Sequence, residues 1–391
     1  MKRRQALSQI ALLATLPFPA LAQSAEWRLG ALFPLSGALA VLGDEAARGL
    51  ELAIEERNAA GGRQMRLIRV DVSEAAQALT EARRLIQQER AHLLFGSVSA
   101  PVGLAAVQAA ESLDSTLVEL AAAADALTER GARHLIRTAP RAADYAMLAA
   151  DALTRVLPGH LGQPVDALRI AILHEASPSA ESIATALQTR LTDTGLVVAD
   201  SLSHALRTAE MPAMVQRLRA AGVNVLIHAS SEGDAVALFR AMADAAWRPA
   251  CIMGVGFAWG LADLARAVGP ALDGVFALDV PPISTAERWA GGARPFAEAY
   301  QRRWASPPRS GLSLATYSGA QLVLAQPNLE RAALRASLVA LDHPEGHLPN
   351  GWGFRLDERG QNTRARPVML QWQAGRPVTV FPGEAAVAAP V

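Results

Sequence analysis

One stretch, residues 30–62, constrains the fold more than any other part of the chain. An apolar run at residues 29–33 predicts a buried strand, and residues 34–37 (PLSG) predict a turn. Apolar side chains then recur at helical spacing, at Ala46, Leu50, Ala53 and Ile54. Because this helix begins at the carboxyl end of the strand, the stretch predicts a crevice in which a ligand can lie.

The same alternation continues along the chain. Residues 65–72 and 168–173 are strand-like, whereas residues 74–90 and 179–191 carry apolar side chains at helical spacing. Strands that alternate with helices predict parallel sheets covered by helices on both faces. The pattern forms two series that part near residues 137–144, so we expect two α/β lobes with a ligand cleft between them.

Length and charge limit the class of protein. The 391 residues are 51% hydrophobic, which is enough for two domains. Lys2, Arg3 and Arg4, an apolar run at residues 10–16 and a small-residue cleavage site predict a signal peptide at residues 1–22, with Sec and twin-arginine export both open. Its removal leaves 34 basic and 37 acidic residues, a net charge of −3, which argues against a nucleic-acid partner. We therefore expect a periplasmic protein.

The chain lacks the motifs of common exported enzymes and metalloproteins. It contains no G-x-S-x-G, H-E-x-x-H or phosphate-binding loop, and His343 and His347 flank helix-breaking residues. The single cysteine, Cys251, lies in an apolar strand and is expected to be a buried, inert thiol. Glu119 interrupts a strand, either as a carboxylate that faces water or as a charge that points into the cleft. We expect no catalytic site, metal or cofactor.

Several motifs together resemble a known family. They are residues 29–37, Gly43 and Gly49, residues 58–62 and 94–96, Leu127-Thr128, Arg137-Thr138 and residues 360–362. This pattern is similar to that of periplasmic binding proteins of the leucine/isoleucine/valine-binding type. The resemblance implies an α/β fold of two Rossmann-like lobes with parallel sheets, joined by a three-strand hinge near Thr138, Leu278 and Arg355. It assigns residues 23–138 and 279–355 to lobe 1, and residues 139–278 and 356–391 to lobe 2.

The resemblance also implies the ligand-binding residues. Carried over position by position, they are Ser99 or its neighbour Ala100, the loop at residues 121–124 with Ala121 and Ala123, Ser179, Ser231 or Glu232, and Gly256. Ser36, in the turn after the first strand, is a further candidate at the rim of the pocket, and Phe257 and Trp259 are candidates because they lie near Gly256. Two departures matter: residues 121–124 contain no hydroxyl, and Gly256 stands where the family holds the ligand ammonium with an acid. A buried ammonium without a counter-charge is costly, so the pattern disfavours an α-amino acid. Phe257 and Trp259 either cover an aromatic or apolar ligand or pack beneath a loop.

The function implied is that of a periplasmic substrate-binding component of an ABC importer. Its ligand is expected to be a small carboxylate, aromatic or branched aliphatic, that is captured by hinge closure. Its partner would be a permease complex in the inner membrane, and the protein would be a monomer. The alternative is a sensor or accessory protein of the same fold that serves a signalling or quinoprotein alcohol dehydrogenase system.

Overall fold

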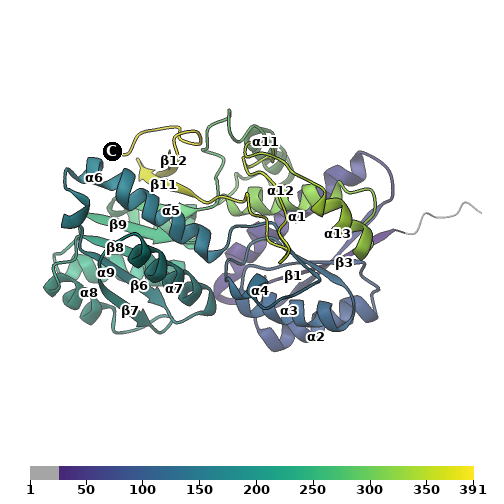
Figure 1. Cartoon of the computed structure of the whole chain (residues 1–391), viewed down its shortest axis with the longest axis horizontal. Coiled ribbons are helices and arrows are strands. Elements are labelled where there is room, and N and C mark those ends of the chain that lie inside the picture. The colour runs from purple at the N-terminus through teal and green to yellow at the C-terminus, as the bar shows by residue number, and fades with distance from the viewer. Residues whose placement is uncertain (1–25) are drawn as a thin grey trace, which may run out of the picture.

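The computed structural model describes residues 26–391, so the predicted signal peptide lies outside the described residues. Figure 1 shows two α/β lobes side by side, each built on its own sheet. The first sheet has the order β2-β1-β3-β4-β5 and is entirely parallel. The second has the order β12-β11-β10-β9-β8-β6-β7. The predicted α/β fold with two Rossmann-like lobes is confirmed.

The first lobe contains the opening stretch. Its strands are β1 (Trp27–Phe33), β2 (Met65–Asp71), β3 (Leu93–Gly96), β4 (Thr116–Glu119) and β5 (Leu135–Arg137). The helices between them are α1 (Ala40–Ala59), α2 (Ala75–Gln87), α3 (Ala100–Ser112) and α4 (Ala126–Glu129). The helix predicted after the turn at residues 34–37 is therefore α1, preceded by a short 3₁₀ turn.

The second lobe repeats this plan. Its strands are β6 (Ile170–Glu175), β7 (Val198–His204), β8 (Val225–Ala229), β9 (Cys251–Val255), β10 (Phe276–Asp279), β11 (Val368–Gln373) and β12 (Arg376–Phe381). Its helices are α5 (Ala142–Arg155), α6 (Leu157–Leu161), α7 (Pro178–Asp193), α8 (Met211–Ala220), α9 (Glu232–Asp244) and α10 (Ala262–Val268). Cys251 is buried as expected, and burial raises the pKa of its thiol to about 12.

We expected parallel sheets, but the second sheet is mixed. Strand β11 is antiparallel to both β10 and β12. The two last strands are joined by Ala374 and Gly375 alone, and both residues have positive φ angles, of 50° and 73°. A two-residue turn with positive φ at both positions reverses the chain and forces antiparallel pairing.

Three further helices come late in the chain: α11 (Ala293–Trp304), α12 (Leu312–Leu324) and α13 (Arg331–Val339). Helix α12 packs along α1 of the first lobe, as Figure 1 shows, and α11 contacts α1 through the Tyr300–Glu45 hydrogen bond. The chain therefore passes between the sheets three times: after β5, between β10 and α11, and before β11. This is the three-strand hinge that the resemblance implies.

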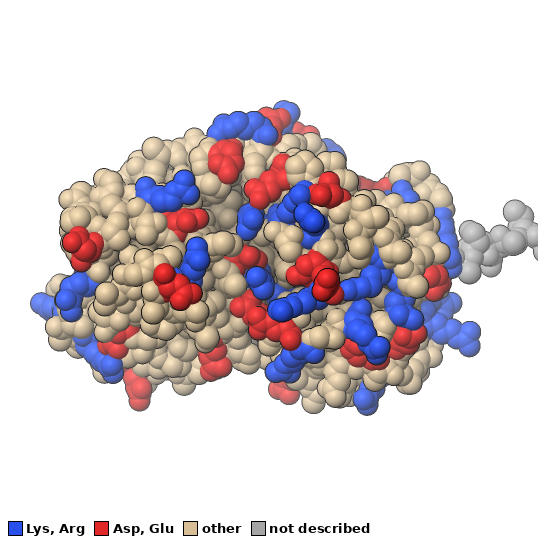
Figure 2. All heavy atoms as spheres, in the orientation of Figure 1, with Lys and Arg blue, Asp and Glu red and all other residues tan. Residues whose placement is uncertain are grey.

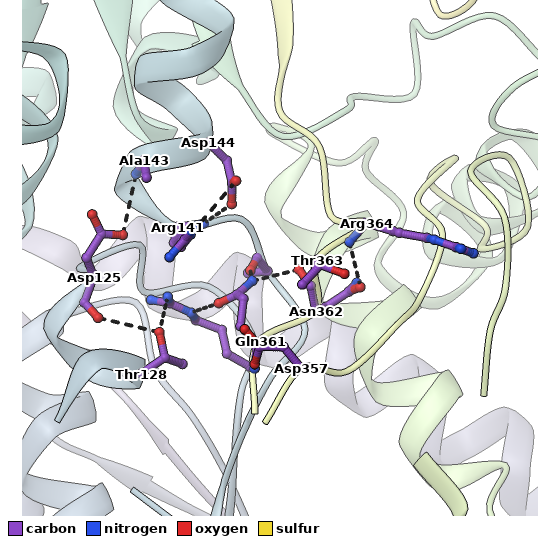
Figure 3. A network of polar contacts seen from close by, with 12 residues as sticks. Asp125, Thr128, Arg141, Ala143, Asp144, Asp357, Gln361, Asn362, Thr363 and Arg364 are labelled. Atoms are coloured by element: carbon purple, nitrogen blue, oxygen red, sulfur yellow. Dashed lines mark hydrogen bonds and ion pairs between the residues drawn. The ribbon is translucent and has the colours of Figure 1, made fainter. Parts of the chain in front are cut away.

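The first and third crossings form one polar network, shown in Figure 3. Gln361 Nε2 donates to the carbonyl of Ala139 (3.0 Å), and Asn362 Nδ2 donates to that of Thr138 (3.2 Å). Residue 361 also pairs with the end of β5. Residues 356–362, which the resemblance assigns to lobe 2, thus pair with the first lobe. The lobe boundaries themselves stay a prediction.

Arg137 lies at the centre of this network. Its guanidinium is fully buried and donates to Gln361 Oε1, to the carbonyl of Ala124 (2.7 Å) and to Thr128 Oγ1 (2.8 Å). All three acceptors are neutral, and burial lowers the pKa of Arg137 to about 10. The side chain therefore acts as a polar clamp between the hinge and the loop that follows β4.

The surface carries both signs of charge intermingled on the face shown in Figure 2. This agrees with the near-neutral balance of the sequence and gives no single-sign patch on that face. Within residues 26–391, no helix is both long and apolar enough to cross a membrane.

The contact between α1 and α12 generates a stability prediction. A Cβ atom at Gly49 would lie 2.1 Å from the carbonyl oxygen of Ser313 and 2.1 Å from Thr316 Oγ1. Gly49→Ala should therefore force the helices apart and lower the free energy of unfolding by about 1–3 kcal/mol, measured by urea denaturation. Gly159→Ala in α6 is the control, since a Cβ there meets nothing within 4 Å. Equal midpoints for the two variants would contradict the close approach.

Candidate ligand-binding site

A cavity of about 180 Å³ lies between the lobes, at the carboxyl ends of the strands. The first lobe contributes Leu39, Leu42, Val98, Ser99, Pro101 and Ala123. The second lobe contributes Tyr145, Glu175, Ser177, Pro178, Ser179, Ala180, Ile183, Ala229, Ser230, Ser231, Val255, Gly256, Phe257 and Ala258. The lining is mainly apolar with a few polar groups, which is typical of a site for a small organic molecule.

Six of the eleven predicted site residues line this cavity. They are Ser99, Ala123, Ser179, Ser231, Gly256 and Phe257. The other five, Ser36, Ala100, Ala121, Glu232 and Trp259, lie outside the lining. Ser36 is exposed, and its backbone N–H is bonded to Asp71 Oδ1 (3.2 Å). Contact of any of these residues with a ligand stays a prediction.

The sequence left two roles open for Phe257 and Trp259, which were contact with a ligand and packing beneath a loop. In the structure, each residue has a different one of these roles. Phe257 lines the cavity. Trp259 is fully buried, and its ring packs edge-on against His228, with centroids 5.5 Å apart. A Cβ atom at Gly254 would overlap the Trp259 ring, so this glycine makes room for it. Trp259 therefore packs beneath the loop, and only Phe257 reaches the cavity.

The lobes also touch each other directly. The backbone N–H of Ala100 lies 3.4 Å from Ser179 Oγ, and that of Asp125 lies 3.1 Å from Ser182 Oγ. Both contacts join the first lobe to α7 of the second lobe. Of these four residues, Ser179 lines the cavity, so a ligand oxygen there could take the place of its hydroxyl as the partner of the Ala100 N–H.

The start of α3 gives the first-lobe wall its polarity. Ser99 is the N-cap residue of this helix and lines the cavity, and Pro101 lies in its first turn. The N-terminus of this 13-residue helix carries a partial positive charge. Its first N–H, that of Ala100, faces Ser179 Oγ, and Pro101 has no N–H to offer. Among residues 26–391, no lysine, arginine or histidine lines the cavity. A ligand carboxylate would therefore find its donors at this helix end and at the Ser99 hydroxyl.

Glu119 supports the first-lobe wall of the cavity through hydrogen bonds. It is fully buried at the end of β4 and accepts hydrogen bonds from the backbone N–H groups of Ser97 (2.6 Å), Ala121 (3.0 Å) and Ala122 (2.8 Å), while Ser97 Oγ lies 2.9 Å from its second oxygen. Burial raises the pKa of this carboxyl, and the donated hydrogen bonds oppose that rise. Neither expected role is correct: Glu119 faces neither water nor the cleft, but ties together two loops.

Glu175 is the corresponding residue of the second lobe, and the sequence reasoning missed it. It ends β6 and lines the cavity. Its carboxylate accepts hydrogen bonds from Ser177 Oγ (2.7 Å) and from the backbone N–H of Ser231 (2.8 Å). The available signal was its place two residues after the apolar run at residues 168–173. Tyr145, also missed, lines the cavity from α5 and is almost fully buried.

A chain of hydrogen bonds leads from the cavity into the second lobe. His204 Nδ1 lies 3.0 Å from the carbonyl of Ala205, so this nitrogen carries a proton. His204 Nε2 then accepts from His228 Nε2 (3.3 Å), and His228 Nδ1 accepts from Ser230 Oγ (3.4 Å). Burial, together with His204 and His174, lowers the pKa of His228 well below its usual value.

This chain predicts an acid-sensitive fold. Below the unfolded-state pKa of about 6.5, the unfolded imidazole of His228 takes up a proton that the native state refuses, so stability falls as the pH falls. When the pH is lowered from 7.5 to 5.5, the melting temperature of His228→Gln should fall by fewer degrees than that of the wild type. The melting temperature of His347→Gln, a variant at an exposed position, should fall by as much as that of the wild type. Parallel pH profiles for all three proteins would contradict this origin of acid sensitivity.

The contacts of Glu119 predict a large loss of stability on truncation. Glu119→Ala leaves three buried backbone N–H groups without an acceptor, each at a cost of about 1–3 kcal/mol. The free energy of unfolding should fall by about 3 kcal/mol or more in urea titrations. Glu129→Ala, at an exposed position in α4, serves as the control and should unfold like the wild type. A wild-type midpoint for Glu119→Ala would remove Glu119 as the support of the wall.

Comparisons with known proteins agree with this geometry. Residues 26–376 match the family model described as periplasmic binding protein. The chain is 36% identical over 372 residues to Leu/Ile/Val-binding protein homolog 7 of Brucella abortus, covering 93% of each chain. The matched family is one of substrate-binding proteins and not of enzymes.

Solved structures show the same fold. The isoleucine complex of LivJ from Streptococcus pneumoniae superposes with a TM-score of 0.77 at 18% identity, over 91% of this chain and 100% of that one. The benzoate complex of a solute-binding protein from R. palustris gives 0.76 at 22% identity, over 93% and 98%. The chain therefore belongs to the periplasmic binding protein family, among the binding proteins of the branched-chain amino acid transporter type.

Proposed function

We propose that this protein is the periplasmic receptor of an ABC importer and captures a small organic solute by closure of its two lobes. The observation that supports this best is the cavity, which is walled by both lobes at the carboxyl ends of their strands. A ligand that contacts both walls stabilises the closed arrangement relative to an open one. The closed form is then the form that docks on a permease complex in the inner membrane.

The proposed ligand carries a carboxylate. Its oxygens bind the Ser99 hydroxyl and, in place of Ser179 Oγ, the N–H of Ala100 at the start of α3, where the helix dipole favours negative charge. Its body is aromatic or branched aliphatic and lies against Leu42, Val98 and Phe257. Relatives of the same fold bind isoleucine and benzoate, which share a carboxylate and an apolar body.

The structure offers another acid for a ligand ammonium. The expectation that α-amino acids are disfavoured rested on Gly256, which has no carboxylate. Glu175 lines the cavity from β6 and supplies a carboxylate there. Amino acids are therefore kept within the proposed ligand class. Export through the signal peptide at residues 1–22 and action as a monomer complete the proposal.

A ligand screen tests the carboxylate requirement. Leucine, 4-methylpentanoate and benzoate should be compared with their amides in thermal-shift and calorimetric titrations. At least one acid should raise the melting temperature, and its amide should not, because the amide has no negative charge to place at the start of α3. A protein stabilised equally by acids and amides would contradict the proposal.

A paired variant locates the carboxylate. Ser99→Ala removes one donor from the cavity wall and should weaken binding of the acid by about tenfold, which corresponds to roughly 1.4 kcal/mol. Ser112→Ala, at the exposed far end of the same helix, should bind like the wild type. Equal affinities for the two variants would move the carboxylate away from α3.

A further inference from the structure

We infer that Glu175 determines the specificity of the second lobe and that the ligand carries an ammonium group in addition to its carboxylate. This inference rests on the proposed function, which it makes more specific. It places the counter-charge at the end of β6, on a different strand from the Gly256 loop, where the family resemblance places the acid.

The charge of the cavity supports this assignment. Among residues 26–391, Glu175 is the only acidic or basic side chain that lines the cavity. Among residues 26–391, no basic side chain lies within ion-pair distance of its carboxylate. Closure of the lobes over a ligand reduces the access of water to this charge. A carboxylate that is buried without a cation costs free energy, and a cationic group on the ligand would offset that cost.

The hydrogen bonds of Glu175 support the same assignment. A carboxylate has about four lone-pair sites that can accept hydrogen bonds. Glu119, in the first lobe, accepts three N–H donors, has a serine hydroxyl beside its second oxygen and is fully buried. Glu175 has two donors, is only partly buried and lines the cavity. Acceptor capacity therefore remains at Glu175, on the residue that a ligand can reach.

The carboxylate is also preorganised. The two donors to Glu175, the side chain of Ser177 and the backbone of Ser231, belong to the N-cap residues of α7 and α9. Two helix N-termini therefore meet at this carboxylate. Ser177 Oγ also accepts a weak hydrogen bond from the N–H of Ala180 (3.4 Å), which fixes the hydroxyl. The carboxylate is held in place before the ligand arrives.

Charge repulsion supports the same assignment. Ser99 and Glu175 line one cavity of about 180 Å³, so a small ligand that binds its carboxylate at Ser99 shares this cavity with the Glu175 carboxylate. The ligand carboxylate and the Glu175 carboxylate repel each other in a site from which water is excluded. A ligand with a carboxylate alone is thus penalised, whereas a zwitterion places each of its charges against a matching group.

The test uses matched ligands that differ only in the ammonium group. Leucine is paired with 4-methylpentanoate, and 4-(aminomethyl)benzoate with 4-methylbenzoate, so that both a near and a distant ammonium are sampled. In calorimetric titrations of the mature chain, the wild type should bind the ammonium-bearing member of at least one pair at least tenfold more tightly. Glu175→Gln should lose that preference and gain affinity for the partner that carries only a carboxylate.

The controls separate this role from a structural one. Glutamine keeps an oxygen for the Ser231 N–H and a polar group for Ser177, so a residue that only clamps loops would weaken both members of a pair equally. Such an equal loss, or no change at all, would overturn the inference and leave the proposed function intact. Glu181→Gln, at an exposed position of α7, should keep the wild-type preference. Absence of binding by every acid in both pairs would instead overturn the proposed function, and the inference with it.

Discussion

The hydrogen bonds to Glu119 support the whole first-lobe wall of the cavity. The loop after β3 and the loop after β4 carry backbone N–H groups that helices and strands leave unpaired, and one buried carboxylate accepts three of them. Glu119 also lies opposite Arg137 in the register of β4 and β5. A buried acid and a buried base on neighbouring strands thus organise the loops on one side and the hinge on the other.

The second lobe also has a strand-end carboxylate that binds loops, with one difference. Glu175 also ends a strand and joins two loops, yet it lines the cavity and has fewer protein donors than Glu119. Parallel strands direct their carboxyl ends, and the loops that follow, to one edge of each sheet. A strand-end carboxylate at such an edge can therefore serve either the protein or a ligand. The number of donors that the protein itself supplies separates these two roles.

The sequence predicted the fold well because alternation and helical spacing are local signals. The antiparallel hairpin of β11 and β12 escaped because a β-like run carries no sign of its direction, and only the turn at Ala374 and Gly375 specifies it. Within the site, Ser99 and Ser179 were predicted through the resemblance and Phe257 through its place beside Gly256, and all three line the cavity. Glu175 and Tyr145 were missed since the lining depends on how strand ends and α5 meet in space.

The hinge and the cavity are connected by a short path. Arg137 bonds the carbonyl of Ala124, and Ala123, the preceding residue, lines the cavity and accepts the N–H of Ala142 at the start of α5 (2.7 Å). The loop at residues 121–124 is thus held by Glu119 at one end, by Arg137 at the other and by the first residue of the second lobe's leading helix. A ligand that contacts Ala123 therefore acts directly on the segment by which the lobes are joined. In the proposed mechanism of closure, this loop would couple binding to closure through its backbone hydrogen bonds, for which it needs no hydroxyl of its own.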